Sequence, residues 1–302
     1  MSTNLLDNAI ALSVTISKIG TRRKVDSRKM VMRETEGEQQ PDSDAIGVNK
    51  ELISAPNFDA ITKLDGDFRT RLYKLSLPNP LFRNGTYLIP ISMLEQIDSM
   101  IENYKNERLS KIAAFLDDYA TAVYDARSRL GGLFNPADYP DKESVRGSFS
   151  VTAQYIEIGI PANLGAISPA IFQREKALFN EKLISAAEEI TAAMRESFNE
   201  LINHMVERLK PGADGKPKIF RDSLVNNFKE FMDTFSARNI TNDTDLEALV
   251  SKAKDILGGK SAEDLRNYDS IRENVVSGIS EIKEQLSGMV IDAPKRKFNF
   301  DE

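Results

Sequence analysis

The chain lacks residues on which whole classes of chemistry depend. It has no Cys and a single His among its 302 residues. Without Cys there is no disulfide framework, no thiolate zinc site and no thiol nucleophile. Imidazole chemistry is limited to one position, His204. We therefore expect a protein that is not an enzyme and that holds no metal and no cofactor.

Long apolar runs are also missing. No window approaches the run of about 18 apolar residues that is typical of a membrane span. The opening MSTNLLDNAIAL lacks the basic start and the small-residue cleavage site of a secretory signal. We expect a folded soluble protein of the cytoplasm with no membrane partner. Its apolar content of 41% is enough for a core, and its net charge of −6 argues against general coating of nucleic acid.

One segment departs from this acidic balance. Seven basic residues fall between positions 18 and 33: Lys18, Arg22, Arg23, Lys24, Arg28, Lys29 and Arg33. Clustered cations neutralise phosphates, so this basic segment is the candidate site for nucleic acid or a protein partner. The alternative is a solvated loop that pairs within the fold with the acidic run ETEGEQQPDSD behind it. We expect residues 34–50 to be a mobile loop.

Period-two alternation predicts three short strands, near residues 11–19, 81–89 and 149–160. The second contains Asn84-Gly85 between apolar-rich arms, a strong hairpin signal because both residues tolerate positive φ.

Apolar residues at three- and four-residue spacing predict helices over residues 56–77, 91–130 and 168–210. The last two carry long, narrow stripes typical of coiled-coil packing, and helices of about 40 residues measure about 60 Å. Ser168-Pro169 predicts the start of the second. We expect the two to pair as a long antiparallel hairpin.

Three shorter helices are predicted after the loop PGADGKPK, at residues 219–236, 243–257 and 261–290. Between the last two, Gly258-Gly259-Lys260-Ser261 is superficially like a phosphate loop. The full motif needs another glycine where Lys254 stands, and a strand before it. The better interpretation is that Gly258 ends one helix, while Ser261 and Asp264 form the capping box of the next.

The sequence thus predicts a mainly α (α+β) fold with a long antiparallel helical hairpin, a small β-sheet and a C-terminal cluster of shorter helices. Three consecutive regions are expected, at residues 1–90, 91–210 and 211–302.

Glu200, His204 and Glu207 share one helix face, but a lone histidine on a charged face is usually solvated, so no metal site is predicted.

Several stretches together resemble an uncharacterised family of phage, plasmid and integrative-element proteins. They are LSVTISKIGTRRKV, FRNGTYLIP, FLDDYATAV, FSARNITNDTDLEALVSKAKDILGG and LRNYDSIRENV. Members of that family are often encoded beside a MoxR-type AAA+ ATPase and a von Willebrand A-domain protein. The resemblance implies a bacterial host cytoplasm and an AAA+ partner, and it assigns no catalytic residue.

These observations lead to two functional hypotheses. The first is a non-catalytic scaffold or adaptor of a phage or mobile element, which forms a homo-oligomer, docks an AAA+ ATPase, or does both. The long apolar stripes motivate it, because function would begin where a stripe is left uncovered. The second is a nucleic-acid-binding accessory factor that uses the basic segment.

Overall fold

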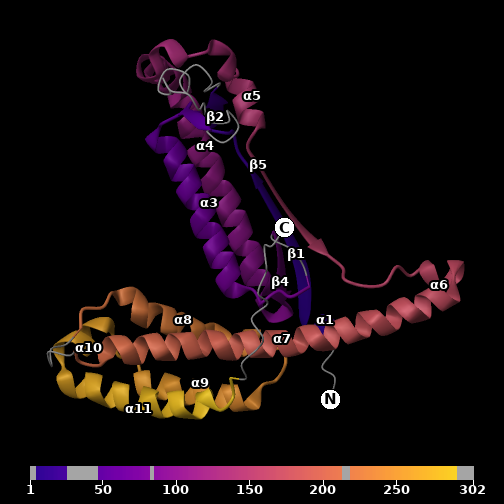
Figure 1. Cartoon of the computed structure of the whole chain (residues 1–302), viewed down its shortest axis with the longest axis vertical. Coiled ribbons are helices and arrows are strands. Elements are labelled where there is room, and N and C mark those ends of the chain that lie inside the picture. Colours follow the sequence, from indigo (N-terminus) through magenta and orange to yellow (C-terminus); the bar gives the residue numbers. More distant parts are fainter. Residues whose placement is uncertain (1–4, 26–46, 82–84, 213–217, 291–302) are drawn as a thin grey trace, which may run out of the picture. The chain divides into compact units, whose positions relative to one another are not determined.

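The structure is a computed structural model that describes residues 5–25, 47–81, 85–212 and 218–290 (Figure 1). Its contacts divide the chain into two compact units that are interleaved in sequence. Unit 1 joins residues 1–12, 73–95 and 155–302, and unit 2 joins residues 13–72 and 96–154. The sequence suggests three consecutive regions, whereas each unit is assembled from separate stretches of the chain.

Four elements contribute residues to both units: β1 (Ala9–Ser17), α3 (Pro56–Leu75), α4 (Leu94–Leu130) and β5 (Ser150–Ile156). Unit 2 adds β2 (Arg22–Val25), β3 (Val48–Glu51), η2 (Gly131–Leu133), η3 (Pro136–Asp138) and α5 (Lys142–Gly147). Unit 1 adds α1 (Leu5–Asn8), β4 (Thr86–Pro90), η1 (Ile91–Met93), α6 (Leu164–Ile167), α7 (Pro169–Leu209), α8 (Asp222–Arg238), α9 (Thr244–Leu257), α10 (Ala262–Asn267) and α11 (Asp269–Ser287). The mainly α (α+β) prediction is confirmed, including the long helices and the C-terminal cluster of shorter ones.

The larger sheet has the strand order β4-β1-β5, so each of the three predicted strand regions contributes one strand. The predicted hairpin around Asn84-Gly85 is only partly described, because residues 82–84 lie outside the described ranges. Gly85 has a φ of 93°, as the turn requires. Before this turn, Leu77 forms an isolated antiparallel β-bridge with Leu88 of β4.

The stripe of α4 packs against α3. Phe58 contacts Phe115 edge-to-face with ring centroids 5.3 Å apart, and Phe68 stacks on Tyr104 at 3.9 Å. Residue numbers rise along α3 as they fall along α4, so the two helices are antiparallel. Together with Val145 and residues before α3, they enclose the core of unit 2.

The stripe of α7 packs against the C-terminal helices of unit 1. In Figure 1, α8 (orange) and α11 (yellow) lie alongside the same half of α7, and α9 packs on α8 and α11. The fully buried side chains of α7 in this core begin at Ala186 and continue to Leu209, and Leu183 packs against the core partly buried. The expected pairing of the two long helices is therefore corrected: each stripe finds its partners among shorter helices of its own unit. Periodicity identifies a stripe but not the helix that covers it.

The predicted helix ends are present. The Ser168 side chain accepts a hydrogen bond from the Ile171 amide, Gly258 adopts the left-handed conformation at φ 45°, and Ser261 forms a capping box with Asp264. The last predicted helix is divided at Tyr268 into α10 and α11. Among the described residues, no helix is long and apolar enough to cross a membrane.

A buried ion pair crosses the α3–α4 interface. Asp65 and Arg108 are only 5% and 2% exposed, and Arg108 Nε donates to Asp65 Oδ1 over 2.8 Å. The Tyr104 hydroxyl donates to the same oxygen over 2.7 Å, and Arg108 Nη2 donates to the Ser17 carbonyl oxygen, also over 2.7 Å. This network supplies the hydrogen bonds that two charges withdrawn from water require.

We predict that Arg108→Met lowers the free energy of unfolding by about 3–5 kcal/mol, because it leaves the Asp65 carboxylate buried without its cation. Urea denaturation followed by circular dichroism measures the change. The matched control is Lys252→Ala, which breaks an ion pair to Glu281 between side chains that are 42% and 61% exposed and costs less than about 1 kcal/mol. Equal effects of the two variants would contradict the structural role of the pair.

Candidate functional site

The structure describes only part of the predicted basic segment. Lys18 follows β1, and Arg22, Arg23 and Lys24 form most of β2. Arg28, Lys29 and Arg33 lie outside the described residues, as do residues 34–46 of the predicted mobile loop. The end of that loop is corrected, since Val48–Glu51 form β3 and pair antiparallel with β2.

Arg23 and Lys50 lie directly opposite each other in this two-stranded ribbon. Like charges directly opposite each other repel. Here the repulsion between the two cations is offset because both bind the same carboxylate. Arg23 Nη1 and Lys50 Nζ each lie 2.5 Å from an oxygen of Asp138, whose side chain is 2% exposed. The hydrogen bond from Lys50 holds the pKa of Asp138 below its ordinary value, against the opposing effect of burial, and the charge of Arg23 adds to the lowering. Arg23 therefore has a structural partner.

A second cation of the segment is also engaged within unit 2. Lys18 Nζ donates to Thr62 Oγ1 over 2.8 Å and lies 5.5 Å from the centre of the Phe58 ring. The exposed cations that remain in the described part are Arg22 and Lys24, which alternate with Arg23 along β2. Arg23 and Lys18 thus interact within the fold, although not with the acidic run of the alternative interpretation, which lies outside the described residues. Binding of nucleic acid or a protein partner by the segment stays a prediction.

Sequence reasoning did not anticipate Lys50 or Asp138 as members of this cluster. Asp138 lies 115 residues from Arg23 along the chain, and no local pattern connects them. One sequence signal could have indicated such a cluster. The basic segment has more cations than nearby carboxylates, so a partner carboxylate could be expected from a distant part of the chain.

The first half of α7 is a second candidate surface. None of residues 169–185 is buried, although apolar residues recur through them apart from the polar run at 173–176. Ile171 and Leu178 are 41% and 45% exposed. We call the four residues Ile171, Phe172, Leu178 and Phe179, which lie outside the buried core, the uncovered α7 stripe. Of the neighbouring elements, α6 packs on α7 near Phe172, whose ring lies beside Gly165.

Two motif-like clusters carry no site chemistry in the structure. Lys260 Nζ donates to the Ile256 carbonyl oxygen over 2.8 Å, so Gly258-Gly259-Lys260-Ser261 is a helix end followed by a cap. Across the described ranges, no group of three or more His, Asp and Glu side chains is placed to hold a metal ion.

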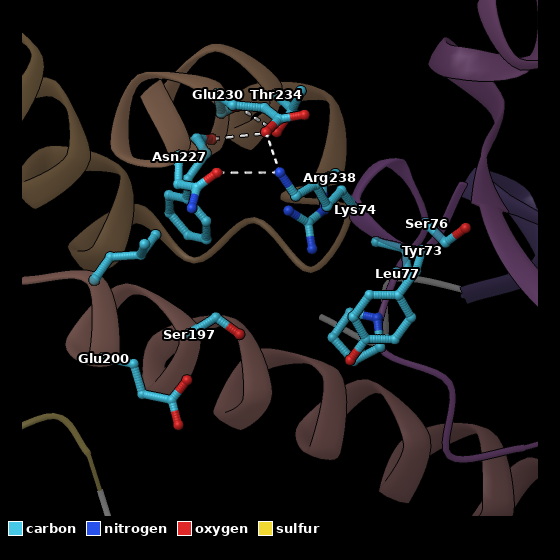
Figure 2. Close-up of a pocket in the computed structure, with 13 residues that line it drawn as sticks. Tyr73, Lys74, Ser76, Leu77, Ser197, Glu200, Asn227, Glu230, Thr234 and Arg238 are labelled. Carbon is cyan, nitrogen blue, oxygen red and sulfur yellow. Dashed lines mark hydrogen bonds and ion pairs between the residues drawn. The ribbon is translucent and has the colours of Figure 1, made fainter. Parts of the chain in front are cut away.

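A pocket of about 360 Å³ lies within unit 1, between residues 73–78, α7 and α8 (Figure 2). One wall is polar: Lys74 Nζ binds Glu230 Oε2 at 2.6 Å and donates to Asn227 Oδ1 over 3.2 Å. Ser197 and Glu200 stand on α7 across the pocket, and Arg238 projects between the two helices. No sequence motif announces this pocket, since its walls come from three separate stretches of the chain.

Three comparisons with known proteins found no match. No protein-family model matches this chain, and no curated protein or solved structure matches it.

We predict that Lys50→Ala lowers the midpoint of thermal unfolding, whereas Arg22→Ala combined with Lys24→Ala leaves it nearly unchanged. The first change deprives the enclosed Asp138 carboxylate of its main partner, and the control removes exposed charges from the same ribbon. The lowered pKa of Asp138 stabilises the fold above the ordinary Asp value of about 3.9, and this contribution is lost as the pH falls through the folded value. The difference between wild type and Lys50→Ala should therefore be full at about pH 7 and shrink below about pH 4. Circular dichroism melts at several pH values measure it, and a difference independent of pH would contradict the ion pair as its cause.

Proposed function

We propose that this protein is a non-catalytic scaffold or adaptor that binds a second copy of itself through the uncovered α7 stripe. One observation carries the proposal: apolar residues recur along the whole of α7, but those before Leu183 do not pack against the core of unit 1. Exposed apolar side chains at coiled-coil spacing are stabilised when another helix excludes water from them.

A second copy suits this surface in pattern and in charge. It presents an identical stripe, so that apolar residues meet apolar residues along the contact. The polar residues around the stripe carry both signs, since Arg174, Lys176 and Lys182 alternate with Glu175 and Glu181. A segment of mixed charge can complement another copy of itself, which favours a closed homodimer.

The resemblance to the mobile-element family extends this proposal to a second partner, an AAA+ ATPase. A scaffold that oligomerises through one helix keeps its other surfaces available for such a partner. The proposal assigns no reaction to the chain, in keeping with its lack of Cys and its single His.

We predict that Leu178→Glu combined with Ile171→Glu converts an oligomer into a monomer of 33.8 kDa, because two charges would then lie in the apolar contact. Sedimentation equilibrium at micromolar concentration gives the mass. The control is Leu109→Glu on α4, which places the same charge at a leucine that is 64% exposed and outside the stripe. A wild-type chain that is monomeric at that concentration would refute self-assembly, as would equal dissociation by the control.

The second candidate function is nucleic-acid binding through Arg22 and Lys24, which are exposed on the β2–β3 ribbon. If these side chains contact phosphates, replacing both with Ala weakens binding to all sequences and lowers the salt slope by about two ion equivalents. Fluorescence anisotropy with labelled single- and double-stranded DNA across a salt series measures this. Arg23→Ala is the informative comparison, because this residue already binds Asp138 and should change the slope less. The absence of wild-type binding at low salt would eliminate this candidate.

A further inference from the structure

Arg238 stands out among the cations of unit 1 because its charge is enclosed and, within the part of the chain that the structure describes, forms no ion pair with a carboxylate. It is the last residue of α8, and its guanidinium lies 5.8 Å from the centre of the Phe231 ring. Its Nε atom is buried and has no hydrogen-bond partner among the described residues. In Figure 2 no dashed line reaches the guanidinium, while Lys74 beside it is joined to Glu230 and Asn227.

Other enclosed arginines of this unit are neutralised within the fold. Arg195, for example, binds both oxygens of Asp243, with Nε and Nη2 at 2.6 and 2.9 Å. Burial lowers the pKa of the Arg238 guanidinium below its ordinary value, and electrostatic interactions with Tyr73 and Glu230 oppose that shift only in part. A buried donor without an acceptor destabilises the fold, so its retention beside a cavity suggests that the acceptor is supplied by a ligand.

The walls of the pocket define the chemistry of that ligand. Leu77, Pro78, Leu201 and Phe231 line the same pocket as Arg238 and provide its apolar surface, and the Phe231 ring is the one beside the guanidinium. The pocket also contains the carboxylates of Glu200 and Glu230, of which Glu230 is already paired with Lys74. Arg238 can neutralise one negative charge of a ligand. A multiply charged phosphate would in addition be repelled by the carboxylates of Glu200 and Glu230, so the pocket favours a ligand with a single negative charge. A planar carboxylate fits the fork of a guanidinium by accepting two parallel hydrogen bonds.

We propose that this pocket binds a small organic monocarboxylate with an apolar body, which Arg238 holds by its carboxylate. The apolar body lies against Leu77, Leu201 and Phe231, and the carboxylate satisfies the guanidinium. The site is independent of self-assembly, because none of its lining residues belongs to the uncovered α7 stripe.

Isothermal titration calorimetry of the full-length chain tests the site with benzoate and hexanoate, and with the neutral analogues benzamide and hexanol. We expect saturable binding of at least one carboxylate, with its neutral analogue weaker by about ten-fold or more, since the charge-assisted hydrogen bonds are lost. Inorganic phosphate at the same concentration should bind more weakly than the carboxylate. Equal binding of the charged and neutral analogues, or no saturable binding of either carboxylate at millimolar concentration, would overturn the proposal. These comparisons need no variant and so do not depend on one that folds.

Arg238→Gln tests the residue itself. We expect it to lower carboxylate affinity by about ten-fold or more and to leave the ligand-free melting temperature unchanged or raised, because it removes an enclosed charge. The matched control is Arg208→Gln on α7, an exposed arginine outside the pocket, which should bind as the wild type does. If Arg238→Gln lowers the ligand-free melting temperature and retains full affinity, the role of Arg238 is to stabilise the fold by packing on Phe231, and the proposal fails. Equal losses in the two variants would also refute it, because they would indicate a general charge effect.

Discussion

The constraint on which unit 1 depends is the mismatch in length between α7 and the helices that cover it. α7 has 41 residues, whereas α8, α9 and α11 have 17, 14 and 19. Shorter helices stacked beside one half of α7 enclose that half, and none of residues 169–185 in the other half is buried. The core of unit 1 and the uncovered α7 stripe are therefore two consequences of one arrangement, and the stripe follows from the packing.

Arginines in these units differ in role because they differ in partner. Arg108 is buried with Asp65 and holds α3 to α4. Arg23 and Lys50 both bind Asp138, and these ion pairs connect the β2–β3 ribbon to η3. Arg238 lines a cavity, and its Nε has no hydrogen-bond partner in the described ranges. A guanidinium enclosed with its carboxylate contributes structure, and one enclosed without it is available to a ligand, so the partner and not the residue type indicates function.

Much of the local structure was open to prediction from the sequence. Helix ends depend on residues within one turn, so Ser168, Gly258 and Ser261 identify the boundaries of α7, α9 and α10. Strand alternation likewise indicates β1, β4 and β5. The ribbon of β2 and β3 was missed, because Arg22–Val25 carries charge where a strand usually shows apolar alternation, and β3 lay in a stretch expected to be a loop. The pocket around Arg238 was also missed, since its walls are far apart in the chain.

The sequence by itself determined which residues are helical, where most helices begin and end, and which face of each helix is apolar. Periodicity and capping decide these properties, and both act between residues a few positions apart. Only the tertiary structure decided that α4 packs on α3, that α7 packs on the C-terminal helices, and that none of residues 169–185 is buried. The physical reason is that any apolar stripe of suitable spacing can pack against another. The choice among partners rests on long-range contacts such as Asp65–Arg108 and Arg195–Asp243, which no local pattern encodes.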